Sequence, residues 1–96
     1  MSCCYILYSK EIDHFYIGST SLKPEERLKR HLEEYYGKQK FTAQVKDWEI
    51  FYVIECSTIE QAKKVEKHIK RMKSRKYIQN LVKYPEISHR LKEKYK

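Results

Sequence analysis

With 96 residues and no Pro/Gly/Ser-rich boundary, the chain is predicted to form a single domain over residues 1–96. Its 21 Lys+Arg against 13 Asp+Glu give a formal net charge of +8, which attracts polyanions and fits either nucleic acid or an anionic membrane. No apolar run approaches the roughly 20 residues that span a bilayer, and no signal-peptide pattern opens the chain, so we expect a cytoplasmic protein without a membrane partner.

The first half of the chain predicts a hairpin followed by a helix. Residues 5–8 and 15–17 are short runs of aromatic and β-branched side chains on either side of a polar stretch, a pattern typical of a β-hairpin. Pro24 then supplies a helix-opening proline, and two acids follow it where the helix dipole favours them. Apolar residues at helical spacing predict a helix over residues 24–36, which Gly37 ends.

The second half predicts a third strand and more helices. Residues 48–56 are rich in aromatic and β-branched side chains, and the length of this strand suggests a central place in the sheet. Thr58 begins a Thr-x-x-Gln capping box, and the apolar stripe behind it predicts a helix over residues 58–73. Residues 77–81 predict a short helical turn, and Pro85 opens a last helix. The order β-β-α-β-α-α predicts an α+β fold, a small and mainly antiparallel three-stranded sheet flanked by helices.

The helix predicted over residues 58–73 begins a dense run of cations that contains a single acid. Lysine or arginine occupies eight positions from Lys63 to Lys76, and Glu66 is the only acid among them. At about 100° per residue, Glu66 lies at the boundary between the apolar stripe and the solvent face. It is explained either by an i,i+4 pair with Lys70 or by a metal ligand that faces a phosphate held by the cations. The cations expected to contact nucleic acid are Lys63, Lys67, Lys70, Arg71 and Lys73.

Two other residue pairs have side chains suited to phosphate chemistry. Arg27 and His31 are four residues apart and share one helical face. A guanidinium can hold a phosphate and a histidine can relay a proton near neutral pH, but a solvated basic face is the alternative. Tyr5 and Tyr16 fall on the two strands of the hairpin, where packing with a wet hydroxyl is the ordinary role of tyrosine. Tyrosine becomes a general base only where cations or a metal stabilise its phenolate.

Taken together, these residues resemble the GIY-YIG nuclease family. Residues 16–18 read Tyr-Ile-Gly, the YIG element, and residues 3–5 read Cys-Cys-Tyr where GIY is expected, so only the tyrosine of GIY is kept. Residues 27–31 resemble the arginine-and-histidine helix of the family, and Glu66 resembles its metal-binding glutamate. Asn80 falls near an asparagine that supports the site in some members. The resemblance covers roughly residues 3 to 81 and is closest to small stand-alone members.

The resemblance implies a metal-dependent endonuclease that hydrolyses phosphodiester bonds, with DNA favoured over RNA and little sequence specificity of its own. Glu66 would hold Mg²⁺ or Mn²⁺, and Tyr5 or Tyr16 would orient or deprotonate the attacking water. His31 would relay the proton, and Arg27 would stabilise charge in the transition state. The residues implied to support this site are Gly18 and Asn80.

Two further function classes fit parts of the pattern. A non-catalytic nucleic-acid-binding module on the same fold explains the charge equally well, but binding alone needs no isolated carboxylate such as Glu66 within a cationic surface. A protein-interaction domain that docks through its tyrosines would bind its partner with little dependence on salt. The joint placement of the catalytic candidates favours the nuclease over both alternatives.

Overall fold

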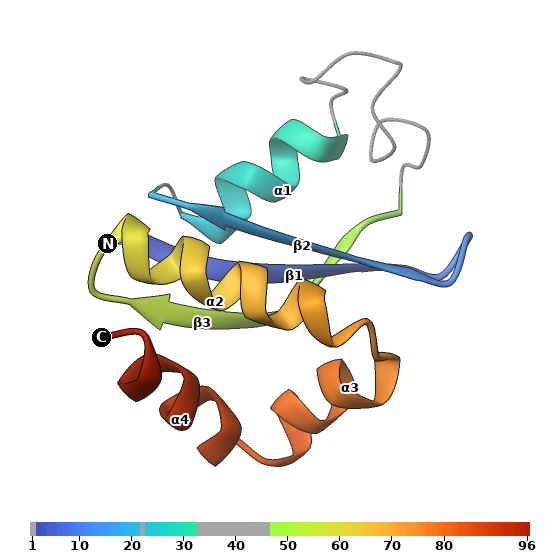
Figure 1. Cartoon of the computed structure of the whole chain (residues 1–96). Coiled ribbons are helices and arrows are strands. Elements are labelled where there is room, and N and C mark those ends of the chain that lie inside the picture. The colour runs from blue at the N-terminus through green and yellow to red at the C-terminus, as the bar shows by residue number, and fades with distance from the viewer. Residues whose placement is uncertain (1, 22, 33–46) are drawn as a thin grey trace.

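A computed structural model describes residues 2–21, 23–32 and 47–96 of the chain (Figure 1). The elements follow the order β-β-α-β-α-α-α, which confirms the predicted α+β class. The strands are β1 (Ser2–Ser9), β2 (His14–Thr20) and β3 (Glu49–Cys56), and the helices are α1 (Pro24–Leu32), α2 (Ile59–Met72), α3 (Arg75–Lys83) and α4 (Glu86–Lys94). Within the described ranges, no helix is long and apolar enough to cross a membrane.

The sheet has the order β2-β1-β3, and both strand pairings are antiparallel. The central strand is therefore β1, and the prediction that residues 48–56 form the central strand is wrong. Residues 3–7 of β1 are at most 3% exposed, because side chains from both layers of the core cover them. Such a continuous apolar run marks a strand that is buried on both faces. The edge strand β3, in contrast, exposes Glu49 and Glu55.

Alternate residues of β1 divide the core into two layers, because successive side chains of a strand point to opposite faces. Cys4 and Ile6 face α2, α3 and α4. Tyr5 faces the other side, where it packs with Trp48 and with Leu28 of α1. Figure 1 shows α1 apart from the other helices, which gather on the opposite side of the strands. Helix α2 lies mainly over β2 and β1, so it borders the edge of the sheet that β2 forms.

The start of α2 has the predicted cap with one difference. The Thr58 hydroxyl accepts a hydrogen bond from the backbone N–H of Gln61 at 3.1 Å, as the capping box requires. The Gln61 side-chain oxygen accepts a hydrogen bond from the backbone N–H of Ser57 at 2.8 Å, whereas a capping box uses the N–H of the next residue, Thr58. The amide nitrogen of the same side chain donates to the carbonyl of Lys92 at 3.0 Å, which ties the start of α2 to the end of α4.

The C-terminal part is more helical than predicted. The short turn expected at residues 77–81 is the nine-residue helix α3, whose N-cap is Ser74 with its hydroxyl accepting from the Tyr77 backbone N–H at 3.1 Å. Pro85 precedes α4 as predicted. The described part of the first helix ends at Leu32, and the remainder of the predicted helix with its terminator Gly37 lies outside the described residues.

Candidate active site

Glu66 projects from α2 toward the edge strand β2. Its Oε1 accepts a hydrogen bond from Ser19 Oγ at 2.6 Å, a contact between residues 47 positions apart. Its Oε2 lies 2.6 Å from Lys70 Nζ, and the Glu66 side chain is only 19% exposed. The i,i+4 pair that the sequence offered as the simpler explanation is therefore present. The bond from Ser19 is a second attachment. It holds the Glu66 carboxylate to the sheet, while Lys70 holds it to its own helix.

The wall behind Glu66 is apolar and uncharged. Cys4 lies opposite Ser19 in the β1–β2 register and belongs to the core cluster beneath α2. Burial, followed by the negative charge of Glu66, raises the pKa of the Cys4 thiol far above its usual range, so this thiol stays neutral. Glu66 thus stands at the boundary between core and surface, as its helical position predicted.

Gly18 provides the space that Tyr5 occupies. The two residues are direct partners in the β1–β2 pairing, and Tyr5 is 0% exposed. A Cβ atom placed on Gly18 would lie 2.5 Å from Cζ and 2.5 Å from the hydroxyl oxygen of Tyr5. The phenol ring therefore extends across β2 at this position, and any side chain at residue 18 would collide with it.

Tyr16 lies two residues before Gly18 on the same face of β2, because alternate residues of a strand share a face. Its ring centroid is 6.3 Å from that of Tyr5 and 6.3 Å from that of Trp48. Tyr16 is only partly buried, whereas Tyr5 is fully enclosed. Of the two tyrosines, Tyr16 is therefore the one that solvent reaches.

The two halves of the candidate site lie on opposite faces of β2. The Tyr5 hydroxyl lies over Gly18 on the α1 face, and Glu66 meets Ser19, the next residue, on the α2 face. Among the described residues, β2 pairs only with β1, so its outer edge separates the two groups. Arg27 and His31 lie on α1, as predicted, but their side chains are outside what the structure describes.

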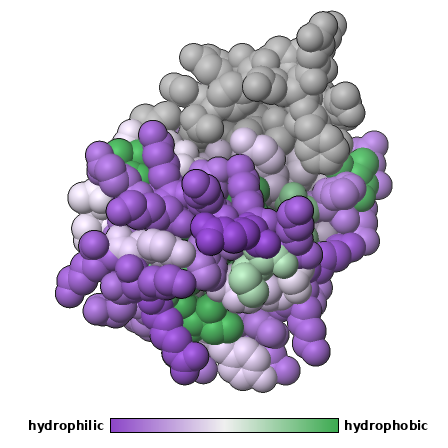
Figure 2. All heavy atoms as spheres, in the orientation of Figure 1, coloured by the Kyte–Doolittle hydropathy of each residue, from purple (hydrophilic) through white to green (hydrophobic). Residues whose placement is uncertain are grey.

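The cations around Glu66 are exposed. The five expected to contact nucleic acid all have exposed side chains: Lys63, Lys67, Lys70, Arg71 and Lys73. At about 100° per residue, Lys63 and Lys70 lie within about 60° of Glu66 around the helix axis, on the flank nearest β2. The opposite flank is covered, because His68 Nδ1 lies 2.8 Å from the Tyr95 hydroxyl. Hydrophilic side chains predominate over the face of the molecule that α2 presents (Figure 2).

A comparison with family models is decisive for the kind of protein. The model of the GIY-YIG catalytic domain matches residues 1–79 of the 96-residue chain. The chain belongs to the GIY-YIG family. Neither the curated proteins nor the solved structures contain a match to it. GIY-YIG proteins are nucleases, which act on nucleic acid and typically use divalent metal ions. The match ends within α3 and leaves α4 beyond it.

Glu66 has the chemistry of a metal ligand in a GIY-YIG site. Magnesium keeps several of its waters and is commonly bound through one or two carboxylates together with phosphate oxygens. An ionised carboxylate offers about four lone-pair positions, of which Ser19 and Lys70 occupy two. Lys70 is 52% exposed, so its flexible side chain can leave Oε2 without disturbing the core. Within the described ranges, no three His, Cys, Asp or Glu side chains gather to hold an ion.

The structure adds Ser19 to the site predicted from sequence and shows no hydrogen bond between Asn80 and Glu66 among the described residues. Ser19 was missed, because nothing in the sequence links it to a helix 47 residues away. Its position directly after Gly18, and hence on the opposite face from Tyr5, is the one signal that was available. Asn80 lies partly exposed on α3, and no hydrogen bond among the described residues joins it to Glu66. A supporting role for Asn80 stays a prediction.

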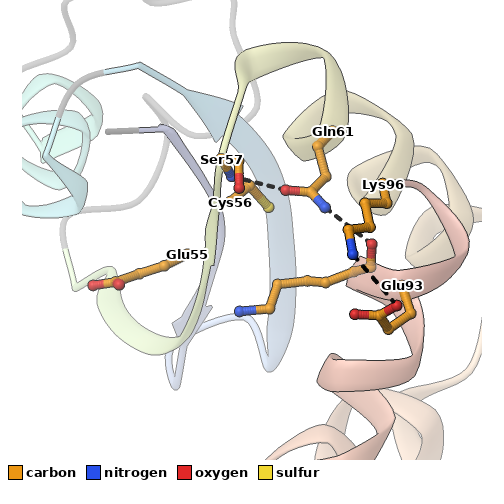
Figure 3. A pocket seen from close by; sticks show the side chains of 7 residues that line it. Glu55, Cys56, Ser57, Gln61, Glu93 and Lys96 are labelled. Carbon is orange, nitrogen blue, oxygen red and sulfur yellow. Dashed lines mark hydrogen bonds and ion pairs between the residues drawn. The ribbon is translucent and has the colours of Figure 1, made fainter.

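One cavity among the described residues lies away from Glu66. It has a volume of about 570 Å³ and is bounded by the end of β3, the start of α2 and the end of α4 (Figure 3). Its charges are mixed: Glu55 and Glu93 line it together with Lys92 and Lys96. Of the two hydrogen bonds of Gln61 drawn there, one caps the start of α2 and the other joins α2 to α4. This cavity has no net charge preference that would attract a polyanion.

Proposed function

We propose that this GIY-YIG protein is a metal-dependent endonuclease that hydrolyses phosphodiester bonds, with DNA as the favoured substrate and little sequence specificity of its own. The observation that carries the proposal is the position of Glu66. It is a partly buried carboxylate, held from two sides at the rim of the core and surrounded by exposed cations. Simple attraction to nucleic acid gives no reason to place an acid there.

In this proposal Glu66 holds Mg²⁺ or Mn²⁺ next to the scissile phosphate. A bound ion supplies Lewis-acid stabilisation of the charge that develops on the phosphate oxygens. Ser19 keeps the carboxylate aimed along the β2 edge through its 2.6 Å hydrogen bond. Lys70 neutralises Glu66 in the free protein and turns toward a phosphate oxygen when substrate binds.

The exposure of the two tyrosines supports a division of roles between them. Tyr16 is partly exposed, so we assign it the contact with the attacking water. Tyr5 is fully enclosed above Gly18 and is assigned the support of Tyr16 and of the edge strand. On α1, Arg27 is assigned the stabilisation of the phosphate charge and His31 the relay of the proton.

A cleavage assay with labelled substrates tests the proposal. Single-stranded, duplex and branched DNA and RNA are incubated with the protein in Mg²⁺, Mn²⁺ or excess chelator, and the products are separated by size. We expect cut products from at least one DNA in Mg²⁺ or Mn²⁺ and none in chelator. Cleavage that survives the chelator would contradict the metal role of Glu66, and intact substrates throughout would contradict the nuclease itself.

The non-catalytic binding module remains the second candidate, and the Glu66–Lys70 ion pair is the observation that favours it. That pair gives the carboxylate a purely structural role if no ion ever displaces Lys70. Both candidates bind phosphates through the cations of α2, so both predict an affinity that falls by orders of magnitude between about 50 and 200 mM salt. Only the nuclease predicts products, so the cleavage assay separates them.

A further inference from the structure

A groove leads away from Glu66 toward the turn between β1 and β2. It has a volume of about 380 Å³ and lies between the start of β2, the end of α2 and the start of α3. Lys70, which pairs with Glu66, forms part of its wall, so the groove adjoins the candidate site. Its floor is apolar and is formed by Phe15, Ile17, Ile69 and Ile78. Its polar rim consists of Asp13, His14, Lys70, Lys73, Ser74 and Arg75.

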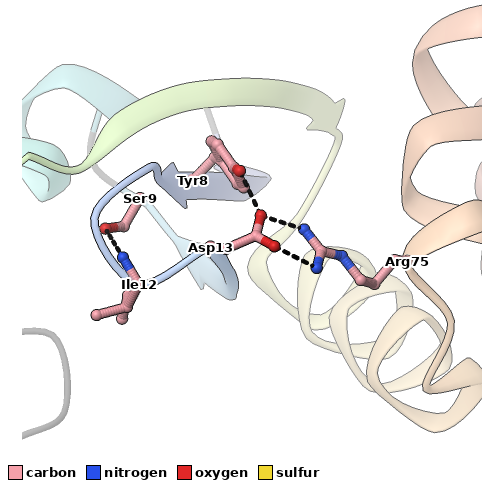
Figure 4. Close-up of polar contacts among 5 residues, drawn as sticks. All are labelled: Tyr8, Ser9, Ile12, Asp13 and Arg75. Carbon is pink, nitrogen blue, oxygen red and sulfur yellow. Dashed lines mark hydrogen bonds and ion pairs between the residues drawn. The ribbon is translucent and has the colours of Figure 1, made fainter.

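The single acid on this rim is already neutralised. Asp13 accepts two hydrogen bonds from the guanidinium of Arg75, at 2.6 and 2.9 Å (Figure 4). The same guanidinium lies over the ring of Phe15, with its central carbon 5.4 Å from the ring centroid. Arg75 is thereby fixed as a flat wall of the groove. Lys70 is likewise paired with Glu66, so the positive charge that remains on the rim comes from Lys73.

Lys73 stands in a backbone conformation that its side chain does not favour. It is the C-cap of α2, with φ 48° and ψ 41°, in the left-handed region where glycine is preferred. Among the described residues, Lys73 makes no ion pair that would stabilise this left-handed conformation. The last turn of α2 already carries Lys70 and Arg71, so a further cation adds little to the interaction with the helix dipole. The charge of Lys73 is therefore available to a ligand outside the fold.

From these observations we infer that the groove binds one unpaired nucleotide of the substrate, next to the phosphate held at Glu66. The inference rests on the proposed function. Lys73 contacts the phosphate of this nucleotide, and the base lies against the apolar floor beside the Arg75 guanidinium, since bases stack on both aromatic and guanidinium planes. A volume of about 380 Å³ is at the small end of ligand pockets and suits a single nucleotide.

Binding without metal tests this inference apart from catalysis. Three labelled DNA duplexes of one length are compared in excess chelator: one fully paired, one with a single unpaired nucleotide, and one with an unpaired abasic nucleotide. We expect the unpaired nucleotide to tighten binding roughly tenfold, as base stacking does elsewhere, and the abasic site to lose that gain. Equal affinity for the paired and unpaired duplexes would overturn the inference.

Two variants, one inside the groove and one outside it, test whether the preference for an unpaired nucleotide arises in the groove. Lys73→Gly removes the charge and relieves the left-handed conformation, so we expect a higher Tm together with loss of the preference for the unpaired nucleotide. Lys64→Gln removes the same charge from an exposed position of α2 outside the groove and should weaken binding to all three duplexes by one common factor. Retention of the preference in Lys73→Gly would overturn the inference, even if the protein cleaves DNA. Absence of cleavage on every substrate would instead contradict the proposed nuclease.

Discussion

Asp13 and Glu66 are both acids paired with a cation and a hydroxyl, yet the two arrangements differ in kind. Asp13 is 60% exposed and is bound by both arms of the Arg75 guanidinium, 62 residues away in the sequence. The Tyr8 hydroxyl donates to the same carboxylate. This cluster joins the β1–β2 turn to the start of α3, and it holds Asp13 at a positive φ of 53°. It works as a fixed link between two distant segments.

Glu66 is paired in the opposite manner. Its cation, Lys70, comes from the same helix and makes a single contact, and the carboxylate itself is mostly buried. A planar guanidinium matches a carboxylate with two parallel hydrogen bonds, whereas a lysine is a point charge on a flexible stem. The first pairing resists exchange and the second permits it. Of the two carboxylates, the one that can change partners is therefore the one at the candidate site.

Conversion of each acid to its amide should separate the two carboxylates most clearly. We expect Glu66→Gln to lower metal-dependent cleavage by orders of magnitude, because it removes the charge that holds the ion, while its Tm shifts little. Binding to DNA in chelator should persist or tighten, since a negative charge leaves a basic surface. Asp13→Asn should have a far smaller effect on the cleavage rate. A Glu66→Gln protein with full turnover would contradict the proposed role of Glu66.

The hydroxyl donors give a second, smaller contrast. Removal of the Ser19 hydroxyl in Ser19→Ala should lower activity by roughly tenfold to a hundredfold and raise the Mn²⁺ concentration that gives half-maximal activity, because groups that orient a metal ligand have effects of this size. Ser19→Thr keeps a hydroxyl and should recover part of the loss. Tyr8→Phe removes the matching donor at Asp13 and should leave cleavage unchanged. An Mn²⁺ requirement that is the same in parent and Ser19→Ala would reduce Ser19 to a packing residue.

The pH dependence of stability gives a third test. Hydrogen bonds from Arg75, followed by that from Tyr8, hold the pKa of Asp13 below its ordinary value of about 3.9. A lowered pKa in the folded state stabilises the protein above the unfolded value, and the contribution is lost as pH falls through the folded value. We therefore expect Asp13→Asn to lower Tm by a few degrees at pH 7, with the difference shrinking steadily below about pH 4. A difference that grows on acidification would show that the link at Asp13 is not ionic.

The smallest expected effect tests the shape of the cation. Arg75→Lys keeps the charge beside Asp13 but gives up the two parallel hydrogen bonds, so Tm should fall by less than in Asp13→Asn. Thermal unfolding at pH 7 measures both variants side by side. A larger loss in Arg75→Lys than in Asp13→Asn would mean that the contact of Arg75 with Phe15, rather than the ion pair, joins the turn to α3.

Local signals in the sequence were enough for much of the fold. Periodicity and caps predicted the hairpin, the helix after Pro24 and the helix that Thr58 begins. Strand order was harder, because the burial of β1 on both faces depends on helices that are distant in the sequence. The helix α3 was underestimated because its N-cap, Ser74, was not recognised as a helix start so soon after the preceding helix.

For the site, the sequence predicted which chemical groups matter but not how they are arranged. Glu66 stood out because it is the only acid among cations, and its boundary position follows from helical geometry. Its contact with Ser19 depends on the packing of α2 against β2, which no local pattern encodes. Likewise, the full burial of Tyr5 and the partial exposure of Tyr16 arise from the two-layer core rather than from the residues themselves.

The close approach of Tyr5 to Gly18 makes the two positions a single unit for mutation. A methyl group at residue 18 would occupy the place of the phenol, so Gly18→Ala should expel the Tyr5 ring and disturb the edge strand. The same methyl group should be harmless once the ring has been shortened, as in Tyr5→Val. Damage at one position is therefore repaired by a second change at the other. A side chain at residue 18 therefore requires a shorter side chain at residue 5.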